Sequence, residues 1–145
     1  MILLDANLLI YAFDISSPHH PSAREWLDSQ LRGLASVGFP WESITAFLRV
    51  VRNPRIYQQP STMAAAWQQI GNWVSEEPSW IPVATGRHSE ILSELLALPG
   101  IRGNHVHDAH LAALALEHGL ILCSADAGFA RFPQLRWLNP LAERS

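Results

Sequence analysis

The sequence predicts an α/β domain of three layers, with a central, mainly parallel sheet of four to five strands between two layers of helices. Two observations support this class. Short apolar runs alternate with helix-like segments along the chain, and several of those segments carry apolar residues at the spacing i, i+3, i+4 and i+7. The length of 145 residues suits one ordinary domain. We therefore expect a single domain over residues 1–145.

The elements follow from local patterns. An apolar run predicts a buried strand at 2–4, which ends at Asp5. A short helix is expected at 7–13. Pro21 suits the first turn of a helix that runs to about residue 34. A stripe of apolar residues predicts the helix 40–53. The other expected elements are strands at 36–39, 80–83, 120–123 and 135–138, and helices at 61–75, 89–98 and 106–118, the last of which ends at Gly119.

The composition excludes several classes of enzyme. The chain has ten Arg and no Lys, against thirteen Asp and Glu, which gives a formal charge of −3. A phosphate-binding loop of the Walker A type needs Lys, as do Schiff-base catalysis and the anchoring of pyridoxal phosphate. A mildly acidic balance also looks unfavourable for binding nucleic acid.

Other features concern the location of the protein. Cys123 is the only cysteine, so we expect neither a disulfide framework nor a cysteine-based zinc site. The apolar runs are too short to span a membrane, and the first residues lack the basic region of a signal peptide. We therefore expect a cytoplasmic protein without a membrane partner.

Four carboxylates are predicted to gather at one edge of the sheet. Asp5 and Asp126 follow strands, and Glu42 and Asp108 lie at the starts of helices whose N-termini face the same edge. Carboxylates that crowd together raise one another's pKa or recruit a cation. Mg²⁺ and Mn²⁺ prefer oxygen ligands and often act on phosphate groups. The pattern thus favours phosphoryl chemistry with a divalent metal.

Each acid also has a structural interpretation. Acidic residues in the first turn of a helix interact favourably with its dipole, which alone explains Glu42 and Asp108, and Asp126 has the position of a turn residue. Glu42 points away from the apolar stripe of its helix and would have to reach over the edge of the sheet. His105, His107 and His110 raise the alternative of a zinc site, but they lack the HExxH spacing.

Four stretches of the sequence, in their order, resemble the PIN-domain ribonucleases, and specifically the VapC toxins of bacterial type II toxin–antitoxin systems. Together they cover essentially the whole chain. The stretches are MILLDANLLIYAFD at 1–14, WESITAFLRVVRNPRI at 41–56, GNHVHDAHLAALALEHG at 103–119 and SADAGFARFPQLRWLNPL at 124–141.

The resemblance implies a PIN fold and a toxic endoribonuclease that hydrolyses RNA phosphodiester bonds, inhibits translation and depends on one or two Mg²⁺ or Mn²⁺ ions. It assigns the catalytic and metal-binding acids, and supporting roles for three polar residues. The acids are Asp5, Glu42, Asp108 and Asp126, and the supporting residues are Asn7, Ser124 and Asn104.

The resemblance also implies partners. It predicts a homodimer and a VapB-type antitoxin whose C-terminal segment wraps the toxin and inserts an Arg or a similar group into the acidic site. Operator DNA would be bound only through the antitoxin. The RNA sequence that is cut is not specified by these residues.

Two other functions remain as alternatives. A HAD-like phosphatase expects Asp-x-Asp and a Lys, whereas this chain has Asp5-Ala6-Asn7 and no Lys. A PIN-fold module that binds proteins and has lost catalysis is the second alternative, although the acids are intact.

With four acids assigned to the site, nine remain against ten Arg, so the acidic balance does not argue against RNA. The absence of Lys leaves Arg as the strong cation for phosphate. Arg49, Arg52 and Arg55 are the expected contacts, with a solvated surface charge as the alternative for each.

Overall fold

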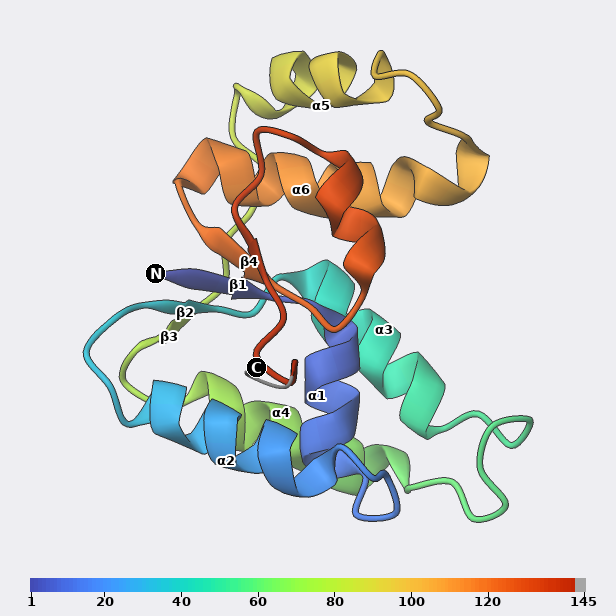
Figure 1. Cartoon of the computed structure of the whole chain (residues 1–145). Helices are drawn as coiled ribbons and strands as arrows, with labels where there is room; N and C mark the ends of the chain where they lie inside the picture. Colours follow the sequence, from blue (N-terminus) through green and yellow to red (C-terminus); the bar gives the residue numbers. More distant parts are fainter. Residues whose placement is uncertain (143–145) are drawn as a thin grey trace.

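A computed structural model describes residues 1–142 of the chain. Its centre is a sheet of five strands, all parallel, in the order β3-β2-β1-β4-β5 (Figure 1). The central strand is therefore the first strand of the chain, flanked by β2 and β4. The strands are β1 (Ile2–Leu4), β2 (Val37–Gly38), β3 (Ser79–Trp80), β4 (Ile121–Cys123) and β5 (Trp137–Leu138).

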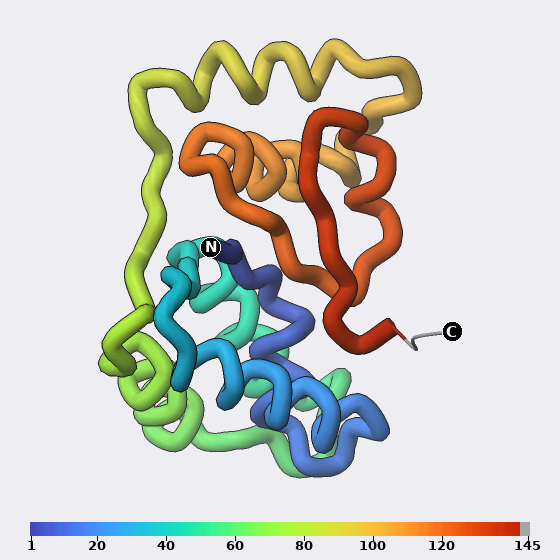
Figure 2. The backbone as a smooth tube through the Cα atoms, turned by 60° about the vertical axis from the view of Figure 1, so that its left-hand side comes forward, coloured from blue at the N-terminus to red at the C-terminus, as the bar shows by residue number. Residues whose placement is uncertain are grey.

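Helices cover both faces of this sheet. The four helices of the first half of the chain lie on one side, and α5 and α6 lie on the other (Figure 2). No helix within residues 1–142 is long and apolar enough to cross a membrane. The helices are α1 (Ala6–Phe13), α2 (His20–Leu31), α3 (Trp41–Val51), α4 (Met63–Val74), α5 (His88–Leu96) and α6 (Val106–His118), with the short 3₁₀ helices η1 (Gly103–His105) and η2 (Ala127–Arg131).

Side chains of β1 alternate between two hydrophobic cores. Ile2 and Leu4 pack with the buried residues of α1 to α4, whereas Leu3 packs with α6 and its neighbours. This alternation is what a strand buried on both faces requires. The three-layer α/β/α arrangement predicted from the sequence is thus confirmed, and the carboxyl ends of its parallel strands meet at one edge, where such sheets commonly bind ligands.

Several predicted boundaries were too long. The helix expected to run to about residue 34 ends at Leu31, and Leu34 is fully exposed. The strand expected at 80–83 is only β3, at Ser79–Trp80. Pro82 explains the second difference, because proline has no N–H to donate to a neighbouring strand.

Two glycines occupy positions where a residue with a side chain would cause strain. Gly119 ends α6 with a left-handed φ of 66°, and the chain turns there directly into β4. In β2, a Cβ on Gly38 would lie 2.9 Å from Pro82 Cγ and 3.2 Å from the carbonyl oxygen of Ile2. A larger residue at 38 would therefore force the first strands apart.

Candidate active site

Asp5 lies at the carboxyl end of the central strand and is the N-cap of α1. Its Oδ1 accepts a hydrogen bond from the backbone N–H of Ala6 at 2.8 Å. Its backbone N–H donates to the carbonyl of Cys123, at 3.0 Å, which fixes it beside the end of β4. The carboxylate is thus held rigidly between two strands.

Ser124 and Asn7 surround the other oxygen of Asp5. The fully buried Ser124 hydroxyl donates to Asp5 Oδ2 at 2.7 Å, and Asn7 Nδ2 donates to the same oxygen at 3.4 Å. The Ser124 oxygen in turn accepts from Asn7 Nδ2 and from the backbone N–H of Asp126, both at 3.0 Å. Residues 117 to 119 positions apart in sequence therefore form one hydrogen-bonded cluster.

Asp126 and Asp108 complete the acidic group. Asp126 is the N-cap of η2, where its Oδ1 accepts from the Gly128 N–H at 2.8 Å. Asp108 lies in the first turn of α6, and its Oδ2 is 3.9 Å from Nη1 of Arg131. The two acids reach the edge of the sheet from different elements, as the topology requires.

These three aspartates repel one another. Burial raises the pKa of Asp5 above its usual range and Asp126 raises it further, although hydrogen bonds from Ser124 and Ala6 and the charge of His107 oppose the shift. Burial also raises the pKa of Asp108, with repulsion from Asp126 and Asp5, against the opposing effects of His107 and Arg131. A cation placed among these acids would favour their ionised forms and offset their mutual repulsion.

Glu42 lies in the first turn of α3, at the start of a helix that follows β2. Its neighbour Ser43 is buried and donates to the carbonyl oxygen of Leu4 at 2.6 Å, which ties the start of α3 to the end of β1. Glu42 Oε2 lies 2.9 Å from His110 Nε2. This hydrogen bond of the Glu42 side chain thus runs to α6, and not to one of the three aspartates.

The remaining predicted site residues are exposed. Asn104 lies in η1, just before α6. Arg49 lies in the last turn of α3, and Arg55 lies in the loop that follows. Arg52 donates from Nη1 to the carbonyl oxygen of Ser61 at 3.2 Å, so it holds this loop.

The donor set suits a hard divalent cation. It consists of carboxylate oxygens, with hydroxyl and amide groups behind them, which is the chemistry that Mg²⁺ and Mn²⁺ prefer. Within residues 1–142, no three His, Cys, Asp or Glu side chains already converge closely enough to hold a metal ion. The acids fit such a cation by their chemistry, and the raised pKa values of Asp5 and Asp108 agree with this fit.

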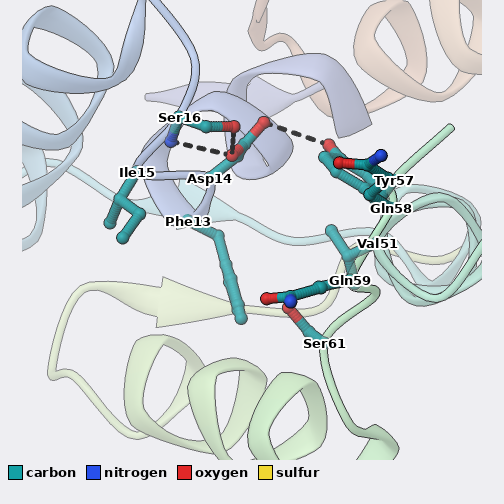
Figure 3. Close-up of a pocket in the computed structure, with 9 residues that line it drawn as sticks. All are labelled: Phe13, Asp14, Ile15, Ser16, Val51, Tyr57, Gln58, Gln59 and Ser61. Atoms are coloured by element: carbon teal, nitrogen blue, oxygen red, sulfur yellow. Dashed lines mark hydrogen bonds between the residues drawn. The ribbon is translucent and has the colours of Figure 1, made fainter.

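A separate hollow of about 610 Å³ lies between the end of α1 and the loop after α3, and its lining includes none of the four acids (Figure 3). On its wall, Asp14 accepts hydrogen bonds from Ser16 and from the Tyr57 hydroxyl. Cys123 is buried in β4, and burial raises its thiol pKa to about 12, so it does not serve as a nucleophile.

Sequence reasoning missed three residues at this site. Arg131 lies five residues after Asp126 in the printed sequence, but its approach to Asp108 depends on how η2 folds. Ser43 gave no signal, because its partner is a backbone carbonyl. His110 was considered only as a zinc ligand, whereas it contacts Glu42.

The chain has a parallel sheet that helices cover on both faces, and acidic residues lie at the carboxyl ends of its central strands. This combination of fold and site indicates the family to which the chain belongs. The family model described as PIN domain matches residues 2–135, and the chain belongs to this family. Within it, the chain is a member of the VapC ribonucleases.

The relatives that support this membership match nearly the whole chain. Ribonuclease VapC37 of Mycobacterium tuberculosis is 39% identical over 142 residues, which cover 98% of this chain and 99% of the relative. Ribonuclease VapC43 of the same species is 35% identical, with 97% and 96% covered. Among solved structures, VapBC2 from Rickettsia felis, bound to a DNA fragment from its promoter, is similar in fold, with a TM-score of 0.67 at 20% identity and 96% and 98% of the chains covered.

Proposed function

We propose that this VapC-family ribonuclease cleaves RNA internally with Mg²⁺ or Mn²⁺ as cofactor, held by Asp5, Asp108 and Asp126 with Glu42. The observation that carries this proposal is the repulsion among two partly buried aspartates, Asp5 and Asp108, and the exposed Asp126 at the end of the central strand. One or two divalent ions would neutralise these charges. When bound, such an ion lowers the pKa of water and stabilises charge on phosphate oxygens.

The residues around the acids orient them for this task. Ser124 and Asn7 fix Oδ2 of Asp5, and His110 fixes Oε2 of Glu42. Hydrogen bonds of this kind hold metal ligands in place and tune their basicity. Arg131, which faces Asp108, supplies a guanidinium that suits a phosphate of the RNA backbone. Asn104, exposed before α6, is assigned to the edge of the same site.

We further assign this protein the role of toxin in a toxin–antitoxin pair, with a VapB-type antitoxin as its partner and arrest of translation as its effect. Relatives named VapC and the similar fold in VapBC2 support this role. A homodimer, and contact with operator DNA through the antitoxin alone, stay predictions from the family resemblance.

The experiment that tests the metal-dependent activity is cleavage of total RNA by purified protein stripped of metal. We expect no cleavage until Mg²⁺ or Mn²⁺ is added, and none by the Asp5→Asn variant under any condition. The matched control is Asp28→Asn, an exposed Asp on α2 that pairs with Arg24. Cleavage by metal-free protein, or by Asp5→Asn at the wild-type rate, would overturn the proposal.

A PIN-fold module without catalysis is the competing function. Calorimetric titration with Mn²⁺ separates the two, because a site that has lost its function gives no heat on binding. The proposed nuclease gives heat in the wild type and in Asp28→Asn, and loses it in Asp5→Asn.

A further inference from the structure

A chain of four hydrogen-bonded side chains leads from the active site into the second hydrophobic core. Glu42 Oε2 lies 2.9 Å from His110 Nε2, and His110 Nδ1 lies 2.9 Å from Nε2 of His88, the first residue of α5. His88 Nδ1 lies 3.2 Å from Glu117 Oε1, near the end of α6. The two imidazole rings thus join two carboxylates on different helices.

Glu117 is the buried end of this chain. Its side chain has no exposed surface, and it accepts hydrogen bonds at 3.3 Å from the backbone N–H and from the hydroxyl of Thr85. His118 Nε2 is farther away, at 3.9 Å, and donates instead to the carbonyl oxygen of Val83 at 2.7 Å. The buried Glu117 carboxylate is thus held by Thr85 and by the ring of His88, which satisfies its oxygens away from solvent.

The hydrogen-bond roles at the two ends of the chain follow from the chemistry of its members. Both carboxylates only accept, so Nε2 of His110 and Nδ1 of His88 each carry the proton of the bond to their carboxylate. The bond between the two rings takes a third proton, which either ring can hold. Three hydrogen bonds thus join the four side chains.

We propose that the buried Glu117–His88 pair is a positioning device for Glu42, an inference that rests on the role of Glu42 in the proposed function. The Glu117 carboxylate accepts from Nδ1 of His88, and the opposite edge of that ring, Nε2, meets Nδ1 of His110. This contact orients the His110 ring so that its Nε2–H meets Glu42 Oε2. The other oxygen of Glu42 is then presented to the acidic site. Thr85 completes the device by fixing Glu117.

A purely structural role does not explain the composition of this chain. A buried pair of charges is often replaced by apolar residues without loss of stability. The pair is instead linked, through one further ring, to an acid of the active site. Such a linkage resembles the outer hydrogen bonds that orient metal ligands, where removal of one partner lowers activity by about 10- to 100-fold.

Nitrogen NMR of the metal-free wild-type protein tests the proton positions without reference to activity. We expect a proton on Nε2 of His110 and a proton on Nδ1 of His88, because each of these nitrogens faces a carboxylate. In Glu117→Gln, the amide still reaches His88 Nδ1, so His110 should keep its Nε2 proton. A wild-type His110 protonated on Nδ1 alone would overturn the proposal.

Kinetics on two variants of His88 test the consequence. His88→Phe keeps a ring but cannot donate to His110, and we expect kcat for RNA cleavage to fall about tenfold at unchanged KM. His88→Gln offers an amide N–H in place of Nε2–H and should recover kcat to within about threefold of the wild type. Glu90→Gln, exposed in the first turn of α5, is the matched control and should behave as the wild type.

The outcomes are distinct. Wild-type kcat in a folded His88→Phe protein would contradict the positioning role, as would equal losses in His88→Phe and His88→Gln. If His88→Phe does not fold, the proton positions in the wild type and in Glu117→Gln decide. An inactive wild type overturns the proposed function, whereas the NMR result still decides whether His88 fixes His110.

Discussion

The guanidinium of Arg131 lies 3.9 Å from the carboxylate of Asp108, at the edge of the acidic site. Its Nη1 and Nη2 also lie near Gly128, where an added Cβ would come within 3.4 Å of either atom. A fixed cation beside acids that are expected to bind a metal partly neutralises them. If Asp108 binds a metal as proposed, Arg131 would compete with that metal for the carboxylate, and its guanidinium would suit an RNA phosphate at the same edge.

Replacement of Arg131 tests both effects. We expect Arg131→Ala to lower kcat/KM for RNA cleavage about tenfold, because the variant can no longer form a charge-assisted hydrogen bond with phosphate. The same variant should bind Mn²⁺ more tightly in calorimetry, because less positive charge opposes the ion. Arg24→Ala, on the exposed side of α2, is the control. If both kcat/KM and the affinity for Mn²⁺ are unchanged in Arg131→Ala, Arg131 is a surface charge without a role at the site.

Asp108→Asn should separate stability from activity. The pKa of Asp108 is raised in the folded protein, so the unfolded chain ionises first as the pH rises above 3.8. The wild type therefore loses stability as the pH increases from 3.8 through the raised pKa, and the variant does not. We expect Asp108→Asn to unfold at higher urea concentration than the wild type at pH 7, with the difference absent below pH 3.8.

The activity of the same variant should fall at least about 100-fold, because the site then lacks one of its metal ligands. Cleavage by Asp108→Asn at a rate close to the wild type would remove this residue from the metal site. A variant less stable than the wild type at pH 7 would contradict the repulsion among the acids. Asp28→Asn is the control for the change of charge alone.

The three exposed arginines after the acidic start of α3 are predicted to contact phosphates. Replacement of Arg49, Arg52 and Arg55 by Ala should reduce the salt dependence of RNA binding, with the slope of log K against log salt falling by about 0.7 for each phosphate that is no longer neutralised. Binding is measured in the Asp5→Asn background to prevent cleavage. Arg32→Ala, exposed after α2, is the control. An unchanged slope would mean that these residues are plain surface charges.

Tyr57 should stabilise the loop that follows α3. Its hydroxyl donates to Asp14 Oδ2 at 3.2 Å (Figure 3). Although partial burial acts to raise the pKa of Asp14, the hydrogen bonds from Ser16 and Tyr57 together lower it. Tyr57→Phe should cost about 0.5 to 1.5 kcal/mol in the free energy of unfolding at pH 7.

This cost should shrink as the pH falls through the lowered pKa of Asp14, because the stabilisation requires the ionised acid. Tyr11→Phe is the matched control, since it changes the only other tyrosine of the sequence. Equal costs for the two variants at pH 7 and at low pH would refute the role of this hydrogen bond.

The sequence was sufficient to predict the class of fold and the order of its elements, because hydrophobic periodicity and the alternation of strands with helices are visible in short stretches of the chain. It also placed Asp5 and Asp126 at one edge, since both follow strands that pair with their neighbours. Element ends were less accurate. Pro82 and the exposed Leu34 mark places where local chemistry ended a strand or a helix earlier than its apolar pattern indicated.

The contacts between distant elements were beyond sequence reasoning. Nothing in the pattern around His110 indicates that its ring joins Glu42 of α3 to His88 of α5, because this arrangement depends on how three helices pack. The same holds for Arg131, whose distance from Asp108 is set by the fold of η2. The residue types were visible in the sequence, but their pairing depends on tertiary structure.

The pairing of β1 with β4 has a consequence for biosynthesis. Asp5 leaves the ribosome before Ser124, which donates to it and is made 119 positions later. The central strand has no β4 beside it until then, so a nascent chain carries Asp5 without its hydrogen-bond partner from the end of β4. The cluster around Asp5 is therefore assembled only after β4 has been made, and a chain that stops before Ser124 cannot form it.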